Sequence, residues 1–216
     1  MKMKKINDMY FPLWCNHFEN RFNNNIGYQE EQRNRALAHV KEFEIAVDCG
    51  AHVGLWSKDL SKFFKKLYSF EPAIEFYECL KKNIISDNTT IYNLALGSQS
   101  ATGEMVITKH DNNSGGSYVL PNINKITYET DIIQKIKLVD LDSFDLPRLD
   151  FFKIDVEGNN FDVLIGAEKT LDRCNPVICL EISKDEKDKR LGKLLTKLNY
   201  KLVDIVKKEY IFRKDI

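Results

Sequence analysis

The sequence carries no surplus of charge, because 32 lysines and arginines balance 32 aspartates and glutamates among its 216 residues. A domain that holds nucleic acid through its phosphates usually has a basic excess, so the composition disfavours that class of protein. No apolar run approaches the roughly 20 residues that span a bilayer. The basic start is followed by polar residues without a small-residue cleavage site, so we expect a protein that is not secreted.

Cysteine is sparse and scattered, with single residues at positions 15, 49, 79, 174 and 179. No pair has CxxC or zinc-ligand spacing, so the sequence indicates neither a disulfide framework nor a structural zinc site. Reduced cysteines are typical of cytoplasmic proteins, and we expect a cytoplasmic location.

From residue 43 onward, short apolar runs alternate with segments of helical spacing. We expect strands at 43–47, 66–70, 90–94, 102–108, 135–139, 149–156, 176–182, 201–206 and 210–213, and helices at 54–64, 73–85, 161–171 and 185–198. This alternation predicts an α/β fold, with a mostly parallel sheet and helices on both faces. Because three residues join the last two strands, the final strand should run antiparallel.

The residues before this pattern are interpreted as a separate unit. A helix is expected at 28–41, so residues 1–42 are predicted to form a small N-terminal helical cap on a domain of residues 43–216.

A glycine turn follows the first strand of the domain, in the segment Val47-Asp48-Cys49-Gly50-Ala51-His52-Val53-Gly54. Doubly wound sheets bind ligands at this carboxyl edge. Gly50 permits a tight turn, and Gly54 lets the helix start close to the strand or the ligand. Glu71 ends the next strand, where an acid can accept hydrogen bonds from both ribose hydroxyls. The alternative is that the glycines only shape a turn and Asp48 caps the helix.

Two adenosine cofactors use this geometry, a nicotinamide dinucleotide and S-adenosylmethionine. A carboxylate at Asp48 repels a diphosphate and attracts an ammonium or sulfonium, by about 1 kcal/mol at ~4 Å in water and by more in a shielded cleft. His52 stands at the second glycine of the dinucleotide fingerprint. We therefore predict S-adenosylmethionine, with an NAD-dependent oxidoreductase as the alternative.

A second pair of acids follows the apolar strand at 149–156. Asp155 and Glu157 are two residues apart and share a side if the strand continues that far. Such a pair can accept a proton from a hydroxyl, orient that hydroxyl or bind a divalent ion. Alternatively, the pair caps the helix beginning near Asn160. Glu181 either completes this acidic cluster or is a surface acid. No histidine or asparagine is placed to complete a metal site, so no metal is predicted.

The polar loop at 109–117 is rich in hydroxyl and amide side chains. It either closes over a cofactor or acceptor or forms a simple hairpin turn. Its candidate acceptor-binding residues are Ser114, Gly115, Gly116 and Ser117.

Six ordered segments together resemble the FkbM family of S-adenosylmethionine-dependent methyltransferases. They are VDCGAHVGLWS at 47–57, SFEP at 69–72, NLALG at 93–97, SGGS at 114–117, LVDLDS at 138–143 and KIDVEG at 153–158. The resemblance implies a Rossmann-like methyltransferase sheet, with Glu71 on the ribose and Ala95 and Leu96 near the adenine. It also implies O-methylation of a hydroxyl, often on a sugar or secondary metabolite. The expected cofactor-binding residues are Asp48, Gly50, Ala51, His52, Gly54, Trp56, Glu71, Ala95 and Leu96.

The expected chemistry is an in-line displacement on a small-molecule or glycan hydroxyl, with Asp155 or Glu157 as the proton acceptor. No nucleic-acid partner and no membrane span are expected. A third hypothesis is a catalytically silent domain that keeps the cofactor fold for partner contacts.

Overall fold

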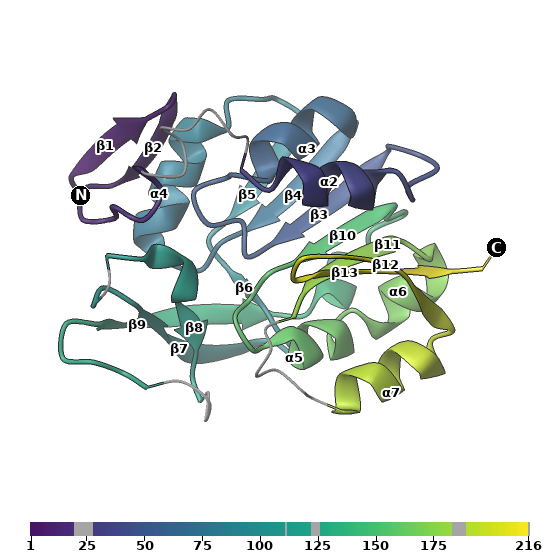
Figure 1. Ribbon diagram of the computed structural model, residues 1–216. Coiled ribbons are helices and arrows are strands. Elements are labelled where there is room, and N and C mark those ends of the chain that lie inside the picture. Colours follow the sequence, from purple (N-terminus) through teal and green to yellow (C-terminus); the bar gives the residue numbers. More distant parts are fainter. Residues whose placement is uncertain (20–27, 111, 122–125, 183–188, 216) are drawn as a thin grey trace.

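The computed structural model describes residues 1–19, 28–110, 112–121, 126–182 and 189–215, and it is built around a seven-stranded sheet (Figure 1). The strand order across this sheet is β12-β13-β11-β10-β3-β4-β5. The strands are β3 (Ile45–Cys49), β4 (Lys66–Phe70), β5 (Thr89–Tyr92), β10 (Phe151–Ile154), β11 (Val177–Glu181), β12 (Tyr200–Val206) and β13 (Glu209–Lys214).

The directions of these strands confirm the predicted topology. The five strands from β5 to β11 pair in parallel, whereas β13 is antiparallel to both of its neighbours, β11 and β12. The final strand therefore lies between two strands that precede it in the chain. This arrangement leaves the carboxyl ends of β3, β4, β10 and β11 together at one edge of the sheet.

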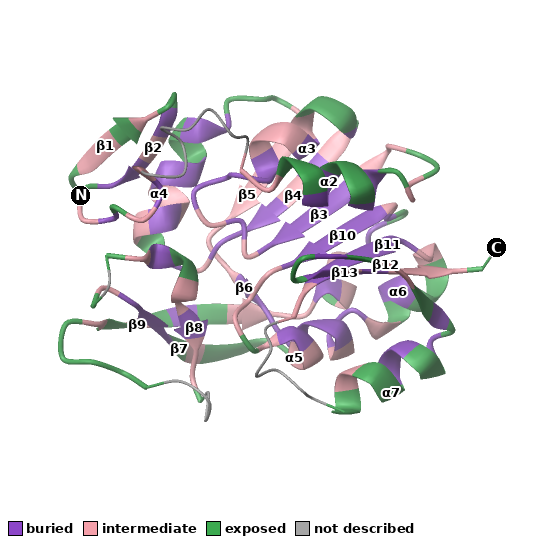
Figure 2. Cartoon of the chain, viewed as in Figure 1, coloured by how far each residue is buried: buried purple, intermediate pink, exposed green. Residues whose placement is uncertain are grey.

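Alternating side chains bury the two faces of the sheet against different helices (Figures 1 and 2). Ala46 and Phe151 pack on the face covered by α2 and α3, while Val47 and Phe152 pack in the cluster that includes α5, α6 and α7. The helices are α2 (Glu30–Leu37), α3 (Ser57–Phe63), α4 (Ile74–Asn83), α5 (Asn160–Ile165), α6 (Glu168–Cys174) and α7 (Lys189–Lys197). No helix of the described residues is both long and apolar enough to cross a membrane.

The predicted helix at 161–171 is two helices, α5 and α6, which meet at Gly166 and Ala167. A Cβ on Gly166 would lie 1.9 Å from the carbonyl oxygen of Gly97, so the chain needs a close backbone approach where the helix breaks. The strand expected at 149–156 is confined to β10, and the start of the helix expected at 185–198 lies outside the described residues.

A second sheet is inserted between β5 and β10, and only part of it was foreseeable from the sequence. Its order is β6-β9-β7-β8, formed by β6 (Ala95–Leu96), β7 (Ala101–Ile107), β8 (Tyr118–Val119) and β9 (Ile132–Val139). The strands expected at 102–108 and 135–139 correspond to β7 and β9. Between β7 and β8, a 3-10 turn at Ser114–Gly116 brings the SGGS segment to the edge where the main sheet ends.

The segment before residue 43 differs from the expected helical cap. It contains the helix α2, but it opens with an antiparallel hairpin of β1 (Met3–Ile6) and β2 (Met9–Pro12). The hairpin is fixed to α4, because the Asn83 amide donates to the Tyr10 carbonyl and accepts from the Tyr10 N–H. Phe11 packs in one hydrophobic cluster with Phe76 of α4. The cap therefore shares its core with the domain that follows it.

Candidate active site

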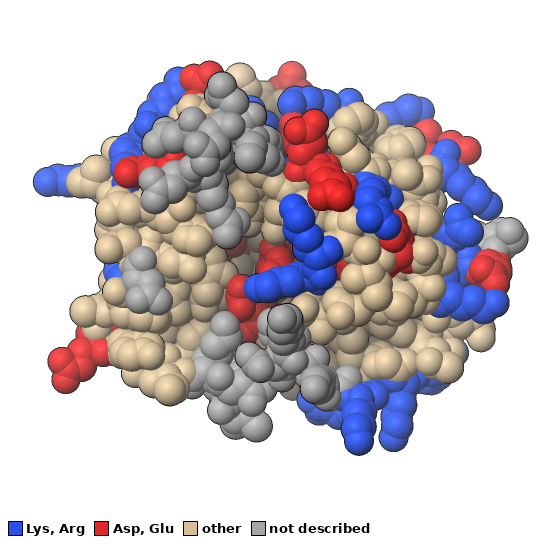
Figure 3. All heavy atoms as spheres, in the orientation of Figure 1, with Lys and Arg blue, Asp and Glu red and all other residues tan. Residues whose placement is uncertain are grey.

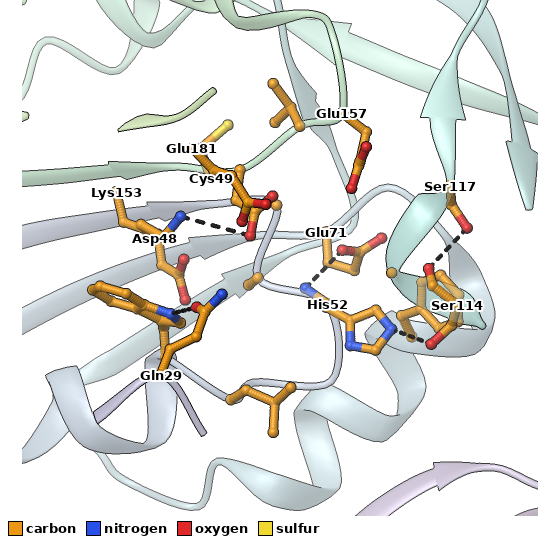
Figure 4. A pocket seen from close by; sticks show the side chains of 18 of the residues that line it. Gln29, Asp48, Cys49, His52, Glu71, Ser114, Ser117, Lys153, Glu157 and Glu181 are labelled. Carbon is orange, nitrogen blue, oxygen red and sulfur yellow. Dashed lines mark hydrogen bonds and ion pairs between the residues drawn. The ribbon is translucent and has the colours of Figure 1, made fainter. Parts of the chain in front are cut away.

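A cavity of about 1340 Å³ opens where the carboxyl ends of the central strands meet. Figure 4 shows the acids, the histidine and the serines that face it, and Figure 3 shows acidic and basic side chains gathered around the hollow on this face. The predicted site residues that line it are Asp48, Gly50, Ala51, His52, Trp56, Glu71, Ala95, Leu96, Ser114, Gly115, Gly116, Ser117, Asp155, Glu157 and Glu181. The structure thus brings together residues that span more than half of the chain.

Gly50 is required by the turn at the centre of this cavity. Its φ of +82° is a conformation that favours glycine, and its N–H donates to the carbonyl of Phe70. A Cβ at this position would lie 1.9 Å from the carbonyl oxygen of Asp155. The glycine turn and the end of β10 are therefore in direct backbone contact, which sets the distance between the two groups of predicted site residues.

Gly54 lies apart from the other predicted cofactor residues, because it is absent from the cavity lining. Its φ is +97°, and a Cβ there would lie 2.8 Å from Cδ1 of Leu80 and 3.1 Å from Cδ1 of Ile84. The small size of Gly54 lets α4 pack against the turn.

Asp48 lines the cavity and also anchors helix α3. The hydroxyl of Ser57 donates to its Oδ2 at 2.5 Å, and the Ser69 hydroxyl lies 2.9 Å from that of Ser57. Burial raises the pKa of Asp48 to about 6, although the Ser57 hydrogen bond and Lys153 oppose the shift. At neutral pH the carboxyl group is therefore mostly ionised, as the electrostatic argument for a positively charged ligand requires.

Glu71 is buried after β4 and braces the glycine turn. Its Oε2 accepts the His52 N–H at 2.8 Å (Figure 4). Its Oε1 accepts the Ala73 N–H at 2.8 Å. Burial raises the pKa of Glu71 to about 7, and these two N–H donors partly offset that shift. Each carboxylate oxygen has a second lone pair, so the group can still accept two hydroxyl hydrogen bonds.

If Glu71 holds ribose hydroxyls as the sequence predicts, its raised pKa makes the binding of S-adenosylhomocysteine, the demethylated form of the predicted cofactor, depend on pH. The ionised carboxylate is the better hydrogen-bond acceptor, so a pKa of about 7 predicts about tenfold tighter binding at pH 8 than at pH 6. Isothermal titration calorimetry at constant ionic strength measures this. The Glu71→Gln variant should have a flatter profile, and equal pH dependence in both proteins would show that another group is responsible.

The raised pKa of Glu71 has the opposite effect on the stability of the ligand-free protein. The folded state holds the Glu71 proton more tightly than the unfolded chain, whose pKa is near 4.5. This group therefore lowers the free energy of unfolding as the pH rises from about 4.5 to about 7.

His52 connects the glycine turn to the loop of the second sheet. Its Nε2 lies 2.7 Å from Oγ of Ser114, and that hydroxyl lies 3.1 Å from Sγ of Cys15. Burial lowers the pKa of His52 to about 4, so the ring is neutral near pH 7. The contact joins the N-terminal segment, the glycine turn and the SGGS loop at one point, and no local sequence pattern predicts it.

The hydroxyl groups of the two serines predicted to bind an acceptor already have hydrogen-bond partners in the protein. Ser114 is 1% exposed, and its hydroxyl lies between His52 and Cys15. The Ser117 hydroxyl donates to the carbonyl of Ser114 and accepts from the Thr108 N–H. These contacts fix the shape of the loop, whose residues 114–117 all line the cavity.

Asp155 and Glu157 both line the cavity, but strand alternation does not place them there. β10 ends at Ile154, and Glu157 has a left-handed φ of +49° in the turn that follows. Oδ2 of Asp155 lies 3.6 Å from Nζ of Lys153. The tight turn, and not an extended strand, turns the two carboxylates toward the same space.

Lys153 is a buried cation that lines the cavity, and it was not among the predicted site residues. Its Nζ lies 3.2 Å from Oε2 of Glu209 and 5.1 Å from the centre of the Trp56 ring. Burial alone would lower the pKa of Lys153, but Asp155 and Glu209 raise it well above the usual value. Lys153 is therefore charged and neutralises part of the acidic cluster.

Glu209 carries no local signal that could have identified it. It lies at the start of β13, in a charged turn of the sequence, and only the pairing of β13 with β11 sets it opposite Glu181. Within the part of the chain that the structure describes, no group of three or more histidines, cysteines, aspartates or glutamates is arranged to hold a metal ion.

The parallel sheet with its antiparallel β13, and the cavity between the glycine turn and Glu71, define a Rossmann-like methyltransferase fold. The model of the Methyltransferase FkbM domain matches residues 48–202. The chain belongs to this family, whose cofactor is S-adenosylmethionine. This membership favours methyl transfer over the nicotinamide alternative.

Two curated relatives are methyltransferases. The chain is 24% identical to methyltransferase sdnD of Sordaria araneosa over 62% of its length, and 26% identical to hexuronic acid methyltransferase AglP of Haloferax volcanii over 74%. It spans 64% of the length of each relative.

Two solved structures share the fold. The methyltransferase FkbM of Methylobacillus flagellatus KT matches with a TM-score of 0.56 and 15% identity, over 82% of this chain and 45% of that one. A precorrin-8w decarboxylase from Methanobacterium thermoautotrophicum matches with a TM-score of 0.50 and 12% identity, over 87% and 90%.

Proposed function

We propose that this chain transfers a methyl group from S-adenosylmethionine to a hydroxyl oxygen of a sugar, a glycan or another small metabolite. The observation that carries the proposal is that one cavity is lined by Glu71 and by the acids after β10, Asp155 and Glu157. One end thus has an acceptor for ribose hydroxyls, and the other has bases for an attacking hydroxyl. The description of AglP as a hexuronic acid methyltransferase supports a sugar-like acceptor.

The residues at the glycine turn suit this cofactor. Glu71 would hold the ribose hydroxyls, and Asp48 supplies negative charge for the methionine ammonium and the sulfonium. Gly50, Ala51, His52 and Trp56 would surround the methionine end, while Ala95 and Leu96 give the adenine an apolar wall. The Asp48 carboxylate disfavours a diphosphate in the same place.

When bound, the cofactor supplies an electrophilic methyl carbon. Asp155 accepts the proton of the attacking hydroxyl, and Nζ of Lys153, 3.6 Å from its Oδ2, orients that carboxylate. Glu157 is the second acid that can take this role. Alignment of the two reactants supplies as much as ~7–11 kcal/mol in favourable cases, and a general base adds about 10²–10⁴-fold.

The Asp155→Asn variant tests the base. We expect methyl transfer to fall by about 10²–10⁴-fold, because asparagine cannot accept the proton, while affinity for S-adenosylhomocysteine stays within about twofold. Incorporation of labelled methyl groups into sugar and metabolite pools measures transfer, and calorimetry measures binding. The matched control is Asp172→Asn, because Asp172 is an exposed carboxylate that pairs with Lys214 outside the cavity.

Unchanged transfer by Asp155→Asn would remove this residue as the base and direct the test to Glu157→Gln. Tight cofactor binding by the natural chain with no transfer to any pool would contradict the proposed activity and favour a silent binding domain.

We also propose a cytoplasmic location. All five cysteines are free in the structure, which supports a reducing compartment.

A further inference from the structure

One end of the cavity carries more charged side chains than methyl transfer requires. Glu181 ends β11, Glu209 begins β13, and the two residues face each other in the antiparallel register. Three strand spacings, or about 14 Å, separate the end of β11 from the end of β4 and its neighbour Glu71. Glu181 and Glu209 therefore lie at the end of the cavity remote from the ribose acid, on the side left for an acceptor.

Glu209 has an unused buried oxygen. The residue is 1% exposed and lines the cavity. Its Oε2 accepts from Nζ of Lys153 at 3.2 Å and from Sγ of Cys179 at 3.4 Å. Its Oε1 has no hydrogen-bond partner among the described residues. Because buried carboxylate oxygens are normally satisfied, this oxygen indicates a place for a hydrogen-bond donor from a ligand.

The charges at this end indicate which kind of donor fits. The carboxyl groups of Asp155, Glu181 and Glu209 gather around one buried ammonium, that of Lys153. Two exposed lysines of the turn before β13 also line the cavity. Nζ of Lys208 lies 3.8 Å from Glu181, whereas Nζ of Lys207 lies 3.6 Å from Glu31.

The ionisation of Glu181 reflects this imbalance. Burial, and then the charges of Asp155 and Glu209, raise the pKa of Glu181 to about 8, so the cluster holds an extra proton near pH 7. A ligand that brings its own positive charge would release that proton.

We propose that Glu181 and Glu209 form an acceptor subsite that binds a protonated amine of the molecule to be methylated. This inference rests on the proposed function, since it assigns a substrate class to the same cavity. Oε1 of Glu209 accepts one N–H of the ammonium and Glu181 accepts another, while the hydroxyl to be methylated lies toward Asp155. A carboxylate at this position would meet three acids, so an anionic acceptor such as a uronic acid is disfavoured here.

The test compares three hexose probes on the full chain saturated with S-adenosylhomocysteine. Saturation-transfer NMR at pH 7 and fixed ionic strength measures the binding of glucosamine, glucose and glucuronate. We expect glucosamine to bind at least tenfold more tightly than glucose, and glucuronate to bind more weakly than either, because charge-assisted hydrogen bonds are the strong ones. Glucosamine binding that does not exceed glucose binding overturns the proposal.

Two variants assign the preference to these acids. Glu209→Gln and Glu181→Gln should each reduce the glucosamine preference by about tenfold. Glu104→Gln, at an exposed position of β7, should leave the preference unchanged. If Glu209→Gln fails to fold because Lys153 loses a buried partner, Glu181→Gln alone decides the question. A preference that survives in the folded variants overturns the subsite.

The outcome is separable from that of the proposed function. A glucosamine preference without any methyl transfer would contradict the activity and retain the subsite. Methyl transfer to neutral hydroxyl acceptors without an amine preference would retain the activity and contradict the subsite.

Discussion

The Glu71→Ala variant is expected to bind S-adenosylhomocysteine at least about 100-fold more weakly than the natural chain. Two hydrogen bonds from the ribose hydroxyls to a carboxylate are worth about 1.5–3 kcal/mol each, and both are lost. The truncation also removes the acceptor of the His52 and Ala73 N–H groups, so the glycine turn loses its brace. Calorimetric titration of the folded variant gives the affinity directly.

The control for this variant is Glu78→Ala on helix α4, whose side chain is 39% exposed and pairs with Lys81. We expect its affinity to remain within about twofold of the natural value, because exposed ion pairs contribute little. If Glu71→Ala binds as tightly as the Glu78 control, the ribose is held elsewhere and the orientation of the cofactor in this cavity must be revised.

The Gly50→Ala variant is expected to lose cofactor binding and to lower the free energy of unfolding by about 3 kcal/mol. A left-handed φ of +82° costs an alanine about 1–2 kcal/mol. The rest comes from the contact of 1.9 Å between the new Cβ and the carbonyl oxygen of Asp155, since backbone on one side or the other must move. Urea unfolding measures the stability, and calorimetry measures binding.

Gly192→Ala is the matched control, because a Cβ there meets nothing within 4 Å and the position lies in helix α7. It should stabilise the chain by about 0.5–1 kcal/mol. Equal unfolding midpoints for Gly50→Ala and the natural chain would show that the turn can relax without cost. The tight contact between the turn and β10 would then not set the geometry of the site.

Local pattern was sufficient for most of the main sheet. The strand at 66–70 coincides with β4, and the short link before residues 210–213 implied the antiparallel β13. The local sequence pattern did not predict the secondary structure where a contact between distant segments determines it. The break between α5 and α6 depends on the approach of Gly166 to Gly97, and the hairpin β1-β2 is stabilised by its packing on α4. Neither contact changes the hydrophobic periodicity of the segment whose structure it determines.

The site shows the same division. The residues Gly50, Glu71 and Asp155 were identifiable because parallel strands all end at one edge, so an acid or glycine at a strand end falls there by geometry alone. Local sequence pattern is therefore enough to specify the main sheet, its binding edge and the sign of the charge at that edge.

Long-range contacts, in contrast, set which side chains remain available to a ligand. In the folded chain, Ser114 contacts His52 and Cys15, and Glu209 lies beside Lys153. Gly54 is absent from the cavity lining. These outcomes depend on pairings between segments far apart in the chain, whose contact energies are absent from any local window of sequence.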